Sequence, residues 1–212
     1  MIAFSGIDCS GKSTQIDLLC REFEKKNIKY EVIWSRGGYT PIIRFIKNLV
    51  RDKQSVTREE RIAYSDSISN NSFKKGILFV ASLIDLWFYY SVVFRIKELF
   101  GTTVVCDRYL WDTYIDYVIK YPGYTHNNGT WWHLMSKTIM KPKVSFIFTL
   151  SAEESMIRST LKEEPFPETV DQRQKRIELY MDEIDNHRWQ YVIDASVPIN
   201  DVFMQVMART NI

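Results

Sequence analysis

The chain has 212 residues, 45% of them hydrophobic and 25% charged, which suffices for one substantial core but is short for two independent domains. Lys and Arg total 28 against 26 Asp and Glu, so the charge of +2 gives no general reason to expect nucleic acid or an anionic membrane as a partner. Three widely spaced cysteines without a CxxC pair argue against a disulfide framework or a zinc site, and favour a cytoplasmic setting. We therefore expect one domain over residues 1–212.

The first predicted strand, Ile2 to Ser5, leads into residues Gly6 to Thr14, whose sequence GIDCSGKST matches the phosphate-binding pattern G-x-x-x-x-G-K-[ST]. Apolar residues at helical spacing follow, and predict a helix that ends near Asn27. A glycine-rich loop between a strand and a helix turns backbone N–H groups toward a phosphate. We expect Lys12, a solvated cation, to contact the β- and γ-phosphates of ATP, and the Ser13 hydroxyl to bind Mg²⁺. The predicted nucleotide-binding residues here are Gly6, Asp8, Cys9, Ser10, Gly11, Lys12, Ser13 and Thr14.

The second predicted strand, Tyr30 to Ser35, precedes an Arg36-Gly37-Gly38 turn. Two glycines beside an arginine would let a substrate phosphate approach both backbone and guanidinium. An ordinary turn with an exposed arginine is an equal alternative. Helices are predicted next at Pro41 to Arg51 and at Thr57 to Ser69.

A long helix is predicted from Gly76 to Phe100, and its stretch Ile77 to Phe94 is apolar enough to raise the question of a membrane span. Because Asp85 and several polar positions interrupt it, we expect a helix buried against a sheet and no membrane. Its apolar surface exceeds what one helix face places on a sheet, which predicts a homodimer through this helix.

The third predicted strand, Thr102 to Asp107, ends in an Asp107-Arg108 pair. Ligands of open α/β sheets bind at the carboxyl ends of strands, so both side chains are expected near the P-loop. Asp107 would hold Mg²⁺ or orient the attacking oxygen, and Arg108 would clamp a phosphate. A surface ion pair is the alternative. Trp131-Trp132 further on is expected in a packed surface loop, or else closing over an acceptor.

The last part of the chain predicts two more strands, Val144 to Leu150 and Tyr191 to Asp194. Helices are predicted at Trp111 to Lys120, Ala152 to Lys162 and Val170 to Asn186, with a proline-containing loop from Leu161 to Val170. Short strands alternating with helices predict an α/β fold: a five-stranded parallel sheet with helices on both faces.

The P-loop with an acid two residues after its first glycine, the Arg36-Gly37-Gly38 turn and the Asp107-Arg108-Tyr109 strand end together resemble thymidylate kinases. The similarity extends over most of the chain. It implies the P-loop NTPase fold of nucleoside monophosphate kinases, with a LID at about residues 159–172. It also implies that Asp8 reaches the sugar hydroxyl of the acceptor, that Arg36 and Arg108 hold its phosphate, and that Arg158 contacts ATP. The residues expected to be catalytic are Lys12, Asp107 and Arg108.

The resemblance implies transfer of the γ-phosphoryl group of ATP to a nucleoside monophosphate, and of these to dTMP first. Where thymidylate kinases carry Asp-Arg or Asn-Arg on the central helix, this chain has Asp85-Leu86-Trp87. A nucleoside, a modified nucleotide or a sugar hydroxyl as acceptor therefore stays open. A nucleotide-binding module without transfer activity is a third alternative, although binding alone makes weaker demands on Asp107 and Arg108.

Overall fold

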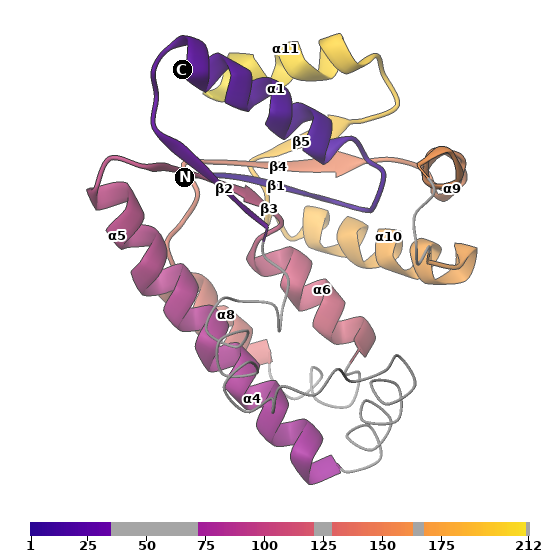
Figure 1. Ribbon diagram of the computed structural model, residues 1–212. Coiled ribbons are helices and arrows are strands. Elements are labelled where there is room, and N and C mark those ends of the chain that lie inside the picture. The colour runs from indigo at the N-terminus through magenta and orange to yellow at the C-terminus, as the bar shows by residue number, and fades with distance from the viewer. Residues whose placement is uncertain (35–71, 121–128, 163–167, 211–212) are drawn as a thin grey trace, which may run out of the picture.

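A computed structural model describes residues 1–34, 72–120, 129–162 and 168–210 (Figure 1). Its centre is a sheet of five parallel strands in the order β2-β3-β1-β4-β5. Ala3 of the central strand pairs with Cys106 on one side and with Ser145 on the other. The strands are β1 (Ile2–Gly6), β2 (Tyr30–Trp34), β3 (Thr103–Asp107), β4 (Val144–Thr149) and β5 (Tyr191–Asp194). All five predicted strands are confirmed, with ends that differ by at most one residue.

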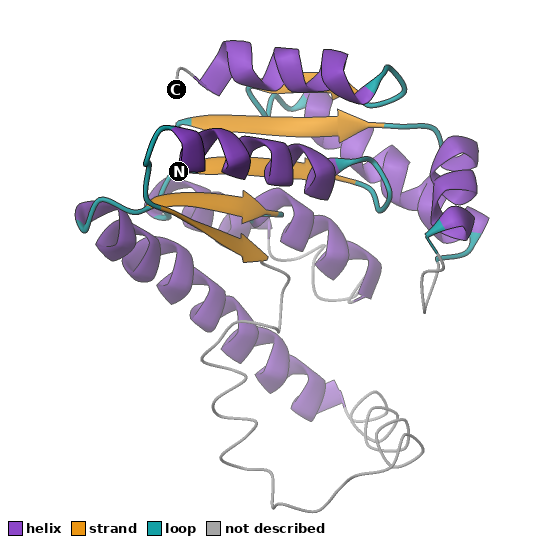
Figure 2. Ribbon diagram, turned by 45° about the horizontal axis from the view of Figure 1, so that its top comes forward, coloured by secondary structure: helices purple, strands orange, loops and turns teal. Residues whose placement is uncertain are grey.

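Helices cover both faces of the sheet, with α1 and α11 on one side and α6, α10 and the α4 to α5 segment on the other (Figures 1 and 2). They are α1 (Lys12–Lys25), α4 (Ser72–Phe88), the π-helical turn η1 (Tyr89–Val93), α5 (Phe94–Leu99), α6 (Leu110–Lys120), α8 (Gly129–Thr138), α9 (Ala152–Leu161), α10 (Val170–Asp185) and α11 (Ile199–Thr210). The helices predicted at Pro41 to Arg51 and Thr57 to Ser69 lie outside the described residues. Helices α8 and α11 were not predicted.

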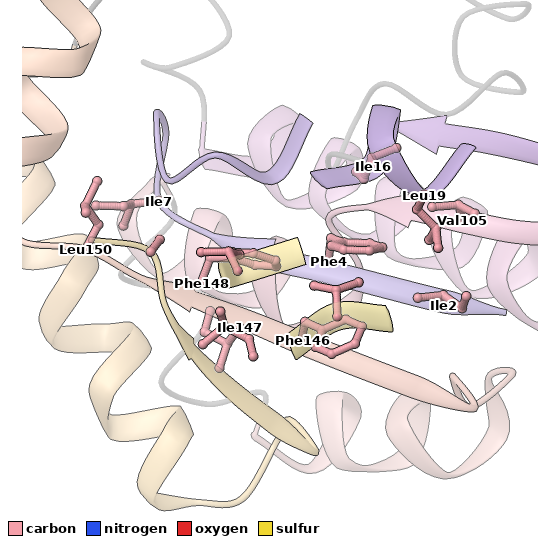
Figure 3. Close-up of a cluster of buried hydrophobic side chains, with 14 of the residues drawn as sticks. Ile2, Phe4, Ile7, Ile16, Leu19, Val105, Phe146, Ile147, Phe148 and Leu150 are labelled. Atoms are coloured by element: carbon pink, nitrogen blue, oxygen red, sulfur yellow. The ribbon is translucent and has the colours of Figure 1, made fainter. Parts of the chain in front are cut away.

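The central strand is buried on both faces, and this determines where the two hydrophobic clusters lie. Ile2 and Phe4 point to the cluster under α1 and α11, whereas Ala3 points to the cluster on the opposite face. In the first cluster the ring of Phe4 lies 5.3 Å from that of Phe146 and 5.8 Å from that of Phe148, measured between centroids (Figure 3). A strand that is buried on both faces consists of consecutive apolar residues, and this is why the strands could be predicted from the sequence.

The expected surface loop at Trp131-Trp132 is wrong, because both residues belong to helix α8. The Trp132 side chain is buried in the second cluster, edge-on to Tyr114 and Tyr117 at centroid distances of 5.3 and 5.6 Å. It therefore packs between helices α6 and α8 and serves the core.

The predicted long helix is present as α4, η1 and α5, and its buried face includes Phe79, Leu86 and Phe94. The stretch Phe79–Leu99 is long and apolar enough to cross a membrane: an 18-residue window within it has a mean hydropathy of 1.5, and 44% of that window is buried inside the protein. A core helix of a soluble protein meets the same criterion, so one such stretch within the described part of the chain is weak evidence for a membrane span.

Candidate active site

The P-loop connects β1 to α1, as predicted, and its path depends on two glycines. Gly6 has φ +136°, and a Cβ there would lie 2.5 Å from the carbonyl oxygen of Phe148 on the neighbouring strand. Gly11 has φ +85° at the N-cap of α1, where open space surrounds it. Position 6 therefore needs glycine for both conformation and space, and position 11 for conformation alone.

A cavity of about 550 Å³ opens beside this loop. Its walls include P-loop residues, the end of β3, and side chains from α9 and the segment after β5. The lining residues are Asp8, Cys9, Ser10, Gly11, Lys12, Ser13, Thr14, Gln15, Trp34, Asp107, Arg108, Arg158, Lys162, Ala195, Val197, Ile199 and Val202. Of the predicted site residues, Gly6, the last residue of β1, is not part of the lining, and Arg36 lies outside the described residues. The apolar part of the wall, from Val197 to Val202, was missed, because the α11 segment was not predicted.

Lys12 is buried, contrary to the expectation of a solvated cation. Its Nζ donates hydrogen bonds to the carbonyl oxygen of Ile7 at 2.6 Å and to Ser10 Oγ at 3.2 Å. Burial and, to a smaller extent, repulsion by Arg108 lower the pKa of Lys12 to about 8, although nearby carboxylates offset part of the shift. An ammonium group with a lowered pKa, whose two hydrogen-bond acceptors are neutral oxygens, is suited to receive an anion.

Arg108 is also buried, so the alternative of a surface ion pair is wrong. Its backbone has φ +75°, and its N–H donates to the carbonyl oxygen of Phe4 at 2.8 Å. The guanidinium forms an ion pair with Asp8 and donates from Nη1 to the carbonyl oxygen of Gly6 at 3.1 Å. Burial lowers the pKa of Arg108, but attraction to Tyr180, Asp8 and Asp112 outweighs it and raises the pKa above its ordinary value. The arginine is therefore a fixed cation beside the first residue of the P-loop.

Asp107 ends β3 at the same cavity. Burial raises the pKa of its carboxyl, and the charges of Lys12 and Arg108 offset part of the rise. Within the described residues, Asp107 Oδ1 is buried and accepts no hydrogen bond. A buried oxygen in this state is suited to a cation or to a donor on a ligand.

The donor set suits Mg²⁺ that also binds a nucleotide. In the described ranges, no group of three or more His, Cys, Asp or Glu side chains could hold a metal ion by itself. The Ser13 side chain is exposed in the cavity and Asp107 supplies an unpartnered oxygen. Two hard oxygen ligands, with phosphate oxygens and water for the remaining positions, are typical of magnesium in phosphoryl-transfer sites.

Arg158 reaches the cavity from α9. Its Nη2 donates to the carboxylate of Glu154 and, at 3.0 Å, to the carbonyl oxygen of Ala195 after β5. The residue therefore joins α9 to the segment that forms the far wall of the cavity.

Ser155 is a supporting residue that the sequence did not reveal. Its hydroxyl donates to the backbone carbonyl of Asp8 at 2.8 Å and accepts from Arg173 Nη1 at 2.6 Å. Ala152, Ser155 and Ser159 are buried along one face of α9, and this spacing of small residues was the available signal.

Two pairs of residues join α6 to α10. Tyr180 OH donates to Asp112 Oδ1 at 2.6 Å, and Arg176 Nη1 forms an ion pair with Asp116 at 2.5 Å. Arg176 also binds Glu168, so one acidic residue of the predicted LID segment neutralises an arginine of the helix that follows. The buried carboxylate of Asp112 was missed, and its signal was an acid four residues after Arg108 in the first turn of a predicted helix.

Comparison with known proteins identifies the family of this chain. Residues 4–206 match the family model of thymidylate kinase. The chain is 27% identical to the thymidylate kinase of Plasmodium falciparum (isolate 3D7) over 208 residues, which cover 97% of this chain and 87% of that protein. It is 26% identical to a probable thymidylate kinase of Thermococcus kodakarensis, over 98% of this chain and 95% of that protein. Since the family model spans nearly the whole length, this chain belongs to the thymidylate kinase family.

Proposed function

We propose that the protein transfers the γ-phosphoryl group of ATP, with Mg²⁺, to dTMP and thereby forms dTDP. One observation carries the proposal: a single cavity brings together Lys12, Asp8 and the Asp107-Arg108 pair. Membership of the thymidylate kinase family supports dTMP as the acceptor. The enzyme is accordingly a nucleoside monophosphate kinase.

In this reaction a phosphate oxygen of dTMP attacks the γ-phosphorus of ATP. A new P–O bond forms, the bond from the γ-phosphorus to the β–γ bridging oxygen breaks, and ADP leaves with the bonding electron pair. The attacking oxygen of a phosphate dianion carries no proton, so no general base is needed. What the site must supply is position and positive charge.

Five of the charged side chains that line the cavity have a role in that scheme. Lys12 turns from its own loop to the β- and γ-phosphates, where the anion restores its full protonation. Arg108, with Arg36 from outside the described residues, holds the acceptor phosphate, and Arg158 contacts ATP. Asp8, now paired with Arg108, turns to the acceptor's sugar hydroxyl when the phosphate takes its place. Ser13 and Asp107 would hold Mg²⁺, which offsets the negative charge of the phosphates.

A hydroxyl acceptor, on a nucleoside or a sugar, is the second candidate, and Asp107 is the observation that favours it. A hydroxyl must lose a proton as it attacks, and a carboxyl with a raised pKa and an unpartnered oxygen is suited to accept one. A modified nucleotide would use the same anion-binding groups as dTMP. A nucleotide-binding module without transfer activity would not need a carboxyl group that accepts a proton.

The test is ADP release measured with dTMP, dUMP, thymidine and simple sugars at saturating Mg-ATP. We expect dTMP to give the highest kcat/KM. The variant Arg36→Lys sharpens the result, since it keeps the charge but loses the forked geometry that binds a phosphate dianion. The KM for dTMP should rise more than that for ATP. An unchanged acceptor KM, or a preference for thymidine, would favour the hydroxyl acceptor.

We also propose that residues 1–212 form one domain with a LID at about 159–172, in a cytoplasmic enzyme. One sheet is built from strands that span Ile2 to Asp194, which supports a single domain. Residues 163–167 of the LID lie outside the described part. Three free thiols, at Cys9, Cys20 and Cys106, are compatible with a reducing compartment.

We further propose a homodimer through helix α4. Val80, Ile84, Trp87 and Phe88 follow one another at helical spacing and are 38–53% exposed. A second copy of this chain presents the same apolar face, so the two faces can pack against each other across a two-fold axis. Ile84→Glu should shift sedimentation at micromolar concentration from dimer to monomer. Ile157→Glu, at an exposed isoleucine on α9, is the matched control and should stay dimeric. A wild-type monomer would refute the proposal.

A further inference from the structure

Asp112 is a nearly fully buried carboxylate, 1% exposed, that the proposed chemistry does not use. It lies in the first turn of α6, yet groups from three other parts of the chain donate hydrogen bonds to it. Ser5 and Gly6 come from the end of β1, Tyr109 from the turn after β3, and Tyr180 from α10. A carboxylate that only stabilised the start of its own helix would need the Tyr109 N–H alone.

The four donors are distributed so that each carboxylate oxygen receives one fixed and one rotatable group. Asp112 Oδ1 accepts from the backbone N–H of Gly6 at 3.3 Å and from Tyr180 OH at 2.6 Å. Asp112 Oδ2 accepts from the backbone N–H of Tyr109 at 3.0 Å and from the hydroxyl of Ser5. A hydroxyl can turn to accept, but a backbone N–H cannot. Both positions therefore require an acceptor, and the amide group of asparagine provides one only.

The Oδ1 side of this carboxylate also faces Arg108. Arg108 Nη1 lies 3.7 Å from Asp112 Oδ1 and donates to Tyr180 OH at 3.3 Å, while the same Nη1 donates to the carbonyl oxygen of Gly6. Asp112 thus contacts the N–H of Gly6 while Arg108 contacts the carbonyl of the same residue. The first residue of the P-loop and the buried arginine are held by one set of contacts.

We propose that Asp112 is a positioning residue for phosphoryl transfer. It holds the guanidinium of Arg108 against the first residue of the P-loop. The arginine that binds the acceptor phosphate and the loop that binds the donor phosphates therefore stay at a constant distance from each other. The inference rests on the proposed function, in which Arg108 holds the acceptor phosphate. Tyr180 brings α10 into the same contacts, so the position of the helix beyond the predicted LID depends on them too.

The test compares two hydroxyl deletions on opposite oxygens of the same carboxylate. Tyr180→Phe removes a donor on the Oδ1 side, next to Arg108, and Ser5→Ala removes one on the Oδ2 side, away from it. Both leave the charge and the two backbone contacts in place. We expect Tyr180→Phe to lower kcat about fivefold and to raise the acceptor KM, whereas Ser5→Ala should keep kcat within about twofold.

Asp112→Asn removes the charge and leaves one backbone N–H facing an amide NH₂. We expect kcat to fall at least about thirtyfold and the acceptor KM to rise several-fold, since small displacements of reacting groups are costly. The Kd for ADP, measured by calorimetry without magnesium, should change less than about threefold, because the loop that binds the donor stays folded. Rates are divided by the folded fraction at the assay temperature.

A purely structural role predicts a different pattern. The proposal is overturned if folded Asp112→Asn keeps kcat within about twofold, or if the Kd for ADP weakens as much as kcat falls. It is also overturned if Ser5→Ala and Tyr180→Phe lower kcat equally, and this pair decides the matter if Asp112→Asn does not fold. If the wild type phosphorylates another acceptor and not dTMP, the proposed substrate fails, and the same ratios are measured with that acceptor.

Discussion

Buried charged side chains around the P-loop differ from the one on the long helix in how they are hydrogen-bonded and paired. Around the P-loop, Arg108 and Asp112 are held by partners from β1, the P-loop itself, α6 and α10. On α4, Asp85 is 8% exposed, and within the described residues neither of its carboxylate oxygens accepts a hydrogen bond. Several elements end at the carboxyl edge of the sheet, so charges there find partners from distant parts of the chain, whereas a position midway along one helix has fewer neighbours that can supply them. We therefore expect the buried charges around the P-loop to support function, and the buried charge of Asp85 on α4 to lower the stability of the fold.

Lys12→Ala tests the P-loop side and should have the largest effect. The kcat should fall at least about 10³-fold, or about 4 kcal/mol of transition-state stabilisation, because the cation that meets the transferring phosphate is lost. Removal of the desolvated charge stabilises the fold, whereas loss of two hydrogen bonds and of a buried side chain destabilises it, so the free energy of unfolding should change by less than about 1 kcal/mol. Measurements are ADP release and urea unfolding.

The matched control for that variant is Lys25→Ala, which removes an exposed lysine paired with Glu22 near the end of the same helix. It should leave both quantities close to those of the wild type. Near-native turnover in Lys12→Ala would contradict the assignment of the P-loop.

Gly6→Ala, at the same edge of the sheet, is compared with Gly101→Ala to separate the cost of a steric conflict from the cost of an unfavourable backbone conformation. The new Cβ would meet the carbonyl oxygen of Phe148 at 2.5 Å, in a backbone conformation that L side chains rarely adopt. We expect the free energy of unfolding to drop by about 3 kcal/mol. Gly101→Ala has φ +73° but open space, so it should cost about 1 kcal/mol. Equal losses in urea denaturation would show that the contact with Phe148 does not matter.

Asp85→Asn tests the long helix and should stabilise the protein. Burial raises the pKa of Asp85 from 3.8 to about 6. Between about pH 4 and pH 6 the native carboxyl then binds more protons than the unfolded one, so wild-type stability falls as pH rises through this window. Above it, Asp85→Asn should be more stable than the wild type by roughly 2 kcal/mol.

Thermal unfolding at pH 4.5 and pH 8 measures this difference, which should be small at the lower pH. Asp182→Asn, at an exposed position of α10, is the control for the substitution itself and should change stability by less than about 0.5 kcal/mol. If Asp85→Asn lowers stability at pH 8, the carboxylate has a partner outside the described residues, and the contrast between the two regions fails.

The strands and the P-loop could be predicted because their signals are local. A strand buried on both faces is an unbroken apolar run, and the phosphate loop is nine consecutive residues with glycine at two of the three positions where φ is positive. Helix α8 was missed because Gly129, Thr130 and two tryptophans are weak helix formers, and packing of Trp132 against α6 overrides that preference. The role of Asp112 could not be predicted either, because its partner Tyr180 lies 68 residues further along the chain.

The π-helical turn Tyr89–Val93 limits the insertions and deletions that the long helix can tolerate. In this turn the Phe94 N–H bonds to the carbonyl of Tyr89, so it contains one residue more than an α-helical turn. Each residue of an α-helix advances the side-chain direction by about 100°, and deleting one residue here would rotate α4 against α5 by that angle. Either Leu86 or Phe94 would then leave the core. Single-residue insertions and deletions elsewhere in α4 can therefore persist in evolution only if this turn gains or loses a residue in compensation.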